Sequence, residues 1–281
     1  MKPDLVQIFG SYTAWMVDEG TYFINFMNGS QNMYLLEGEN QALLIDTGWG
    51  AGNLRAFVEK LIDKPILVAN SHFHPDHAAG NGEFDWVYVS ENYEADAETM
   101  NSQELAFDIS MLPHVDYEKK ILRDGDTIDL GGRIIDVWEA KPAHCNSSLF
   151  FYDRSKKLFF VGDELEGAQV NIFNLTSKPD VHTTRKCLEN AKANYERIKK
   201  KLPEINMLLP NHNGFPLAKL YVDEYIELVD HIFAGDAVVE EKLNHPFIEH
   251  DPKAPYLCRV RWKHASFFAF KEDILAIMKE A

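Results

Sequence analysis

The sequence contains few cysteines and no long apolar run. Its three cysteines, Cys145, Cys187 and Cys258, are an odd number and lie far apart in 281 residues. This argues against a disulfide framework and favours a reducing compartment, so we expect a cytoplasmic protein. No apolar stretch could span a bilayer, and the first residues lack the pattern of a secretory signal. The sequence therefore predicts a globular protein without a membrane partner.

Basic residues are also scarce, with 28 Lys and Arg against 44 Asp and Glu, which leaves a net charge of −16. Such a surface repels phosphate backbones, and no Lys/Arg cluster is interleaved with aromatic residues. The densest basic run, residues 197–201, ends a predicted helix, where it complements the helix dipole. We therefore expect a small-molecule substrate and no nucleic-acid partner. The oligomeric state stays open, with a homodimer among the alternatives.

What the sequence does contain is two strand-rich halves, each of which also supplies helices. Period-two patterns and turn residues predict strands, and apolar residues at helical spacing predict helices. The predicted strands are 5–8, 21–26, 32–37, 41–46, 65–70, 86–90, 126–129, 133–138, 147–152, 157–162, 205–212 and 257–270. Predicted helices follow residue 50, cover 184–201, follow residue 212 and cover 271–280, with a short helical turn over 77–82.

No linker divides the chain, so residues 1–281 are expected to form a single domain with a C-terminal extension from about 244. Two strand-rich halves, each with its own helices, predict an α+β fold. Its expected form is a four-layer αββα sandwich of two mixed β-sheets flanked by helices.

The densest chemical signal is the run His72-Phe73-His74-Pro75-Asp76-His77 after the predicted strand 65–70. Four metal-competent side chains occupy six residues, and imidazole and carboxylate groups suit a cation such as zinc. A lone pair of loop histidines would mean little, but this crowding is difficult to explain otherwise.

Three more candidate ligands each follow an apolar stretch that resembles a strand: His144, Asp163 and His212. Each one alone has an ordinary explanation, since an Asp after a strand is usually a turn residue or a helix cap. Their order and their similar settings favour a shared role.

With these residues the chain resembles the metallo-β-lactamase-fold superfamily of metal-dependent hydrolases, over roughly residues 30–215. The resemblance includes residues 43–48 (Leu-Leu-Ile-Asp-Thr-Gly) and the segment 122–132 before His144. It implies two divalent metal ions, with zinc as the default and manganese or iron left open. In the family pattern one ion is held by His72, His74 and His144, the other by Asp76, His77 and His212, and Asp163 bridges them.

The resemblance also implies a chemistry, in which a hydroxide shared by the two ions attacks a carbonyl carbon. Asp76 is then the candidate catalytic residue, since it could orient the nucleophile or relay its proton. Asp46 is a candidate for accepting a hydrogen bond from a ligating histidine, although it could equally be an ordinary turn residue at the end of a strand. Cys145 is expected to pack rather than bind metal, and His182 is expected to be an ordinary residue at a helix start.

The departures from other branches of the superfamily narrow the function. His77 and Asp163 stand where β-lactamases of this fold often carry other residues, and His74 stands where diiron flavoproteins carry Glu. The full set resembles the glyoxalase II, lactonase and phosphodiesterase branches. We therefore expect hydrolysis of a small acyl substrate, which could be a thioester, a lactone or another ester. The alternatives are an iron-dependent oxidoreductase similar to persulfide dioxygenases, or phosphodiester or β-lactam hydrolysis.

Substrate specificity is expected to reside between the ligands, in segments 91–118 and 165–182, with 244–281 as a further candidate. Tyr93, Phe107 and Phe173 are potential apolar contacts there, although core packing would explain them as well.

Overall fold

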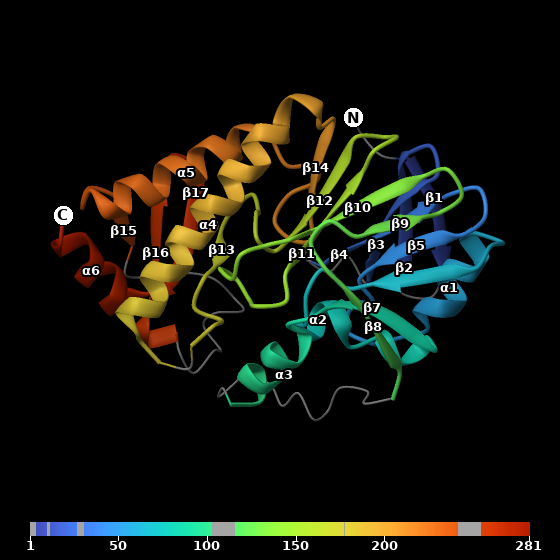
Figure 1. The fold of residues 1–281 in the computed structure, drawn as a ribbon, viewed down its shortest axis with the longest axis horizontal. Helices are drawn as coiled ribbons and strands as arrows, with labels where there is room; N and C mark the ends of the chain where they lie inside the picture. The colour runs from blue at the N-terminus through green and yellow to red at the C-terminus, as the bar shows by residue number, and fades with distance from the viewer. Residues whose placement is uncertain (1–3, 10–11, 27–30, 103–115, 177, 241–253) are drawn as a thin grey trace.

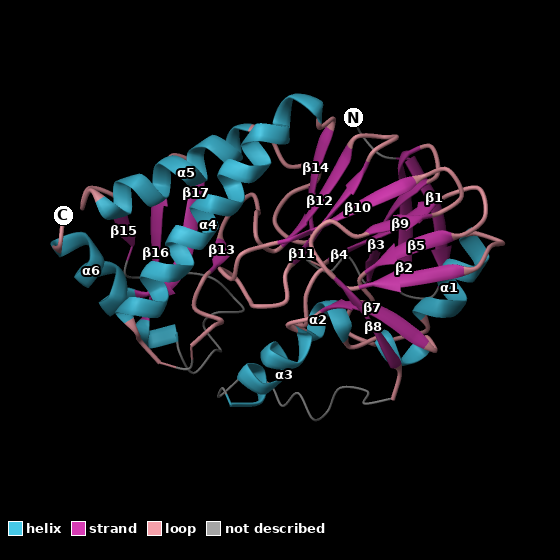
Figure 2. Ribbon diagram, viewed as in Figure 1, coloured by secondary structure: helices cyan, strands magenta, loops and turns pink. Residues whose placement is uncertain are grey.

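The first sheet contains eight strands that lie side by side in chain order (Figures 1 and 2). The computed structural model describes residues 4–9, 12–26, 31–102, 116–176, 178–240 and 254–281. Neighbouring strands run antiparallel from β1 to β5 and parallel from β5 to β8. The strands are β1 (Asp4–Phe9), β2 (Tyr12–Asp18), β3 (Thr21–Phe26), β4 (Asn32–Glu37), β5 (Ala42–Ile45), β6 (Ile66–Ala69), β7 (Trp86–Ser90) and β8 (Glu118–Leu122).

The second sheet has the strand order β14-β12-β11-β10-β9. Only β12 and β14 run parallel, because the chain between them makes a crossover that contains helix α4. The strands are β9 (Thr127–Asp129), β10 (Ile134–Glu139), β11 (Leu149–Asp153), β12 (Leu158–Gly162) and β14 (Met207–Pro210).

Capping residues and terminal charges mark where the helices begin and end. The side chain of Asn53 accepts a hydrogen bond from the amide of Ala56, 2.8 Å away, at the start of α1 (Leu54–Leu61). Asp180 does the same for α4 (Val181–Lys201), which ends in three lysines that complement its dipole. The other helices are α2 (Pro75–Ala78), α3 (Tyr93–Ser102), α5 (Leu220–Phe233) and α6 (Lys271–Lys279), with 3-10 turns at Asn81–Glu83, Leu202–Glu204 and Ala254–Tyr256. Within the described ranges, no helix has the length and apolar character to cross a membrane.

Three apolar clusters define the layers. One lies between the first two sheets and includes Tyr34 and Phe160, whose rings meet edge to face. A second fills the space between the first sheet and α1. The third joins the outer face of the second sheet to α4 and α5. The predicted α+β class and four-layer αββα order are therefore confirmed, because each sheet has one face on the other sheet and one on helices.

A third, four-stranded sheet was not predicted. Its order is β13-β17-β16-β15, from β13 (Val170–Asn171), β15 (Val238–Glu240), β16 (Leu257–Trp262) and β17 (Ala265–Phe270), and it packs against α5. The prediction of one strand over 257–270 was wrong, since the chain turns back at residues 263–264, where Lys263 has φ of 51°. No Gly, Pro or Asn marks this turn, so no local signal predicted a break in the strand. Residues 241–253 of the expected C-terminal extension lie outside the described ranges.

Candidate metal centre

The candidate ligands come from the ends of strands in both large sheets. The run 72–77 follows β6, Asp163 follows β12, His212 follows β14, and His144 lies in the loop between β10 and β11. Because β5, β6 and β7 are parallel, and β12 and β14 are parallel, each group delivers its carboxyl ends to one edge of its sheet. The two edges meet, so that all seven predicted side chains come together at one rim of the sandwich.

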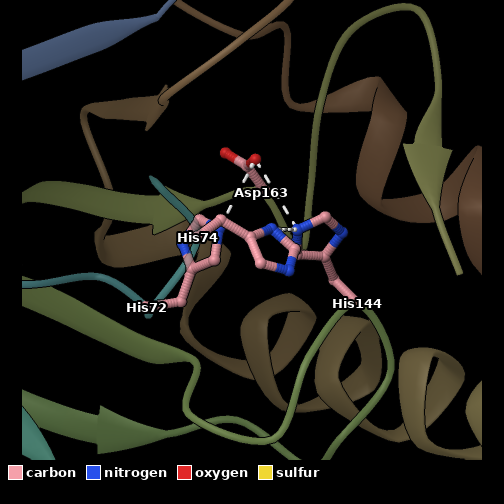
Figure 3. A group of neighbouring side chains, drawn as sticks. All are labelled: His72, His74, His144 and Asp163. Atoms are coloured by element: carbon pink, nitrogen blue, oxygen red, sulfur yellow. Dashed lines mark hydrogen bonds and ion pairs between the residues drawn. The ribbon is translucent and has the colours of Figure 1, made fainter. Parts of the chain in front are cut away.

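Four of them form what we call the first cluster: His72, His74, His144 and Asp163 (Figure 3). Nε2 of His144 lies 2.9 Å from Nδ1 of His74. Nε2 of His72 and Nε2 of His144 each lie 3.7 Å from Oδ2 of Asp163. All four side chains are buried. The first cluster therefore presents three imidazole nitrogens and one carboxylate oxygen toward a common point.

The second cluster contains Asp76, His77 and His212. Nε2 of His212 lies 3.0 Å from Oδ2 of Asp76 and 3.2 Å from Nε2 of His77. His77 is fully buried, whereas the side chain of Asp76 is 19% exposed. The side chain of His212 is 14% exposed, so solvent can reach both Asp76 and His212 but not His77.

Asp163 belongs geometrically to both clusters. Its Oδ2 also lies 3.3 Å from Nε2 of His77 and 3.5 Å from Nε2 of His212. One carboxylate oxygen thus approaches histidine nitrogens of both clusters. This is the arrangement expected of a group shared between two cations.

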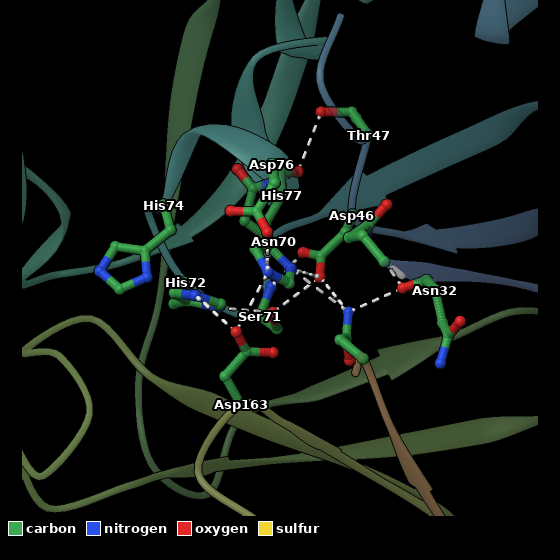
Figure 4. Close-up of polar contacts among 12 residues, drawn as sticks. Asn32, Asp46, Thr47, Asn70, Ser71, His72, His74, Asp76, His77 and Asp163 are labelled. Carbon is green, nitrogen blue, oxygen red and sulfur yellow. Dashed lines mark hydrogen bonds and ion pairs between the residues drawn. The ribbon is translucent and has the colours of Figure 1, made fainter. Parts of the chain in front are cut away.

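Asp46 contacts the candidate ligand His77 and the residues around it, as Figure 4 shows. Its Oδ2 lies 2.9 Å from Nδ1 of His77 and accepts a hydrogen bond from the hydroxyl of Ser71 at 2.7 Å. Its Oδ1 accepts from the backbone amide of Ser71 at 2.6 Å, and the side-chain amide of Asn211 also donates to this carboxylate. Asp46 has φ of 67°, a left-handed conformation that Asp tolerates better than most residues. Of the two roles open for Asp46, the structure favours the orientation of His77 over a simple turn residue.

Burial and charge set the protonation of the two clusters in opposite directions. Burial lowers the pKa of His74 and of His144 to about 4, so both imidazoles are neutral near pH 7, as metal ligands must be. Burial would also lower the pKa of His212, but Asp163 and Asp76 outweigh it and raise the pKa to about 9. The same carboxylates, with Asp46, hold the pKa of His77 well above its usual range despite burial. The second cluster therefore favours a positive charge.

Two buried atoms support the fit of a metal to these residues. Nε2 of His72 and Oδ1 of Asp163 are buried and lack a hydrogen-bond partner. A buried polar atom without a partner costs about 1–3 kcal/mol, and a coordinated cation would remove that cost. Histidine nitrogens and carboxylate oxygens are also donors that zinc, manganese and iron accept.

Several predicted neighbours lie outside the two clusters. Cys145 is buried with its Sγ 3.0 Å from the hydroxyl of Ser148, in agreement with a packing role. His182 is exposed in the first turn of α4. Phe173 packs against the third sheet with Leu257, Phe268 and Phe270, and Phe107 lies outside the described residues.

Sequence reasoning missed four residues that hold the ligands in place. His144 directs its Nδ1 to the backbone oxygen of Asn171 at 2.8 Å. Glu164 accepts a hydrogen bond from the His144 amide at 3.2 Å, and Ser71 and Asn211 bind Asp46 as described above. Ser71, Glu164 and Asn211 each adjoin a ligand in sequence, which could have identified them. Asn171 acts through its backbone, so its side chain gave no signal.

The fold and the site define a class of proteins in which a histidine–carboxylate centre lies at the rim of an αββα sandwich. The family model of the metallo-β-lactamase superfamily matches residues 27–212, more than half of the chain. The chain therefore belongs to the metallo-β-lactamase superfamily, as its motifs predicted.

Three individual proteins resemble this chain at sequence identities of 28% or less. The human acyl-coenzyme A thioesterase MBLAC2 is 28% identical over 187 residues, which cover 54% of this chain and 66% of that relative. The match thus spans slightly less than two thirds of the relative's length. A metallo-β-lactamase from Pontibacter korlensis is 18% identical with a TM-score of 0.54, over 82% of this chain and 99% of that one. A β-lactamase domain protein from Burkholderia ambifaria is 17% identical with a TM-score of 0.58, over 79% of this chain and 78% of that one. These two structures show likeness of fold alone.

Proposed function

We propose that the protein is a dinuclear metal-dependent hydrolase that cleaves a small acyl substrate, with a thioester as the first candidate. The observation that carries this proposal is the position of Asp163. Its Oδ2 lies within 3.7 Å of histidine nitrogens from both clusters, so one carboxylate can bridge two ions. A single-metal site would need no such shared group.

Under this proposal the first cluster holds one ion and the second cluster holds the other, with Asp163 common to both. Two divalent cations bound there, zinc by default, would lower the pKa of a water molecule and polarise the substrate carbonyl. The protein's own contribution is to keep the ligands in place and to keep two histidines of the first cluster in the neutral state that a cation requires. Burial keeps His74 and His144 neutral, and Asp46 orients His77.

Asp76 is the proposed catalytic residue. Burial would raise its pKa, but His77 and His212 outweigh that effect and hold the pKa well below the usual range, so the carboxylate is ionised near pH 7. Its partial exposure lets it accept a hydrogen bond from the attacking water and orient that water toward the carbonyl carbon. A proton released in the attack can pass through the same carboxylate to the leaving group.

The thioester is favoured by the similarity to the human relative, which is an acyl-coenzyme A thioesterase. The net charge of −16 works against an anionic carrier, because coenzyme A carries several phosphate charges. The substrate test therefore compares acyl-coenzyme A with an uncharged thioester of the same acyl group.

The test combines metal analysis with a substrate panel of thioesters, lactones, simple esters, a phosphodiester and a β-lactam. We expect about two ions per chain and cleavage of at least one acyl substrate. His74→Ala removes a ligand and should abolish turnover, whereas His264→Ala, at an exposed position of the third sheet, should not.

Turnover that persists in metal-free protein would refute the proposal. One iron per chain with oxygen uptake on a persulfide would replace it with the oxidoreductase alternative, since such an enzyme needs a single redox-active ion.

A further inference from the structure

Two separate loops supply the three histidines of the first cluster. His72 and His74 come from the loop after β6, and His144 comes from the loop between β10 and β11. The loops are joined directly, because the amide of Phe73 donates to the hydroxyl of Ser147 at 3.1 Å. The distance between His74 and His144 therefore depends on how these two loops are held against each other.

The first turn of α3 contacts both loops. Tyr93 is buried, and its ring meets that of Phe73 edge to face, with the ring centroids 4.8 Å apart. Its hydroxyl also accepts a hydrogen bond from the side-chain amide of Asn81 at 3.2 Å. Asp96 lies three residues after Tyr93, in the same first turn and on the same face of the helix, and is 2% exposed.

Asp96 accepts three hydrogen bonds from the turn that follows His144. Its Oδ1 accepts from the backbone amide and from the side-chain amide of Asn146, each at 2.8 Å. Its Oδ2 accepts from the amide of Ser147 at 2.6 Å. Hydrogen bonds to a buried carboxylate are short and roughly twice as strong as neutral ones. Both carboxylate oxygens are engaged in this way, so Asp96 acts on the turn and not on an ion.

We propose that Asp96 is a positioning residue for the first metal ion: from α3 it fixes the turn that carries His144, and thereby sets the approach of His144 to His74. The inference rests on the proposed function, in that these histidines bind metal. Glu164 also accepts a hydrogen bond from the amide of His144 but adjoins Asp163, so Asp96 is the better residue to test.

The test measures zinc affinity of the full-length protein by competition with a chelator, in parallel with its unfolding midpoint. Asp96→Asn keeps the size of the side chain but presents an NH2 group to a turn that offers only N–H donors. We expect the affinity of one ion to fall by about tenfold to a hundredfold, the usual effect of losing a group that orients a ligand. Glu98→Gln, an exposed change on the same helix, should leave both affinities unchanged.

Asn146→Ala is a milder variant that removes one of the three hydrogen bonds to Asp96 and keeps Asp96 bonded to the backbone. It should lower the affinity for the same ion by a few-fold, and it replaces Asp96→Asn as the test if that variant does not fold.

Two double variants distinguish a positioning role of Asp96 from general destabilisation of the fold. In a His212→Ala background, which lacks a ligand of the second cluster, Asp96→Asn should still weaken the remaining ion. In a His144→Ala background it should have no further effect, because the residue through which it acts is gone. The inference would be overturned if Asp96→Asn lowered the zinc affinity equally in both backgrounds, or lowered it in neither. Failure of the unmodified protein to bind two zinc ions would instead refute the proposed function itself.

Discussion

The carboxylate of Asp163 offers the most direct perturbation of the site, through Asp163→Asn. The substitution keeps the size of the side chain and one carbonyl oxygen but removes the negative charge shared by both clusters. Oδ2 of Asp163 lies 3.5 Å from Nε2 of His212, and Coulomb's law at an effective dielectric constant near 20 gives about 5 kcal/mol per unit charge at that distance. If water and neighbouring dipoles compensate half of this, about 2.5 kcal/mol remains, which is nearly a hundredfold in affinity.

We therefore expect Asp163→Asn to weaken both ions by about a hundredfold and to lower acyl-substrate turnover at least in proportion. Metal content after dialysis against a chelator and initial hydrolysis rates measure the two effects. Asp230→Asn removes the same charge from an exposed position on α5 and serves as the matched control. The reasoning fails if the Asp163 variant retains both ions at the affinity of the unmodified protein, or if only one of the two affinities changes.

Two further predictions concern stability. In the metal-free protein, the pKa of His74 and of His144 is about 4, so between pH 6.5 and 4 these two histidines take up protons only in the unfolded chain. Their contribution to the free energy of unfolding should therefore fall as the pH drops through this window. The fall is up to about 1.4 kcal/mol per pH unit for each histidine. Because burial raises the pKa of Glu164 to about 7 and so acts in the opposite direction over this window, the check compares urea unfolding at pH 7 and pH 5 for the unmodified protein and for His144→Gln. The fall in stability from pH 7 to pH 5 that His144 causes should be missing from the variant, and identical pH changes in the two proteins would contradict the prediction. Arg133→Ala should cost about 3–5 kcal/mol in urea unfolding, because it leaves the buried carboxylate of Asp153 without its partner 2.6 Å away. Arg154→Ala, which breaks an exposed ion pair, should cost far less, and similar losses for the two variants would refute the distinction.

The candidate ligand set could be selected from the sequence because ligand type and strand ends are local properties. The run from His72 to His77 places four donors in six residues, and an apolar stretch before each of the other candidates marks a strand end. The structure brings all of them together. The role of Asp46 could not be decided in this way, since a turn residue and a buried support have the same local sequence.

Most elements that the sequence analysis did not predict lack a strong local signal, and β2 (Tyr12–Asp18), which contains Thr13, Trp15 and Val17, is the exception. Strand β8 is the edge strand of the first sheet and is mostly polar, with Glu118, Lys119 and Lys120, as edge strands often are. Strands β13 and β15 are two and three residues long, too short for a period-two pattern to be recognised. The third sheet depends on these short strands pairing with a C-terminal hairpin, and such pairing is a tertiary property.

The sequence by itself determined which side chains can bind a cation and in which order the strands deliver them, because both depend on residue type and spacing. Only the tertiary structure decided that Asp163 reaches both clusters and that Asp96 lies against the turn after His144. Apart from the contact of Asp163 with His144, these contacts join residues about 50 or more positions apart. Packing between the two sheets and α3, which no local pattern encodes, brings them within hydrogen-bond or ligand distance.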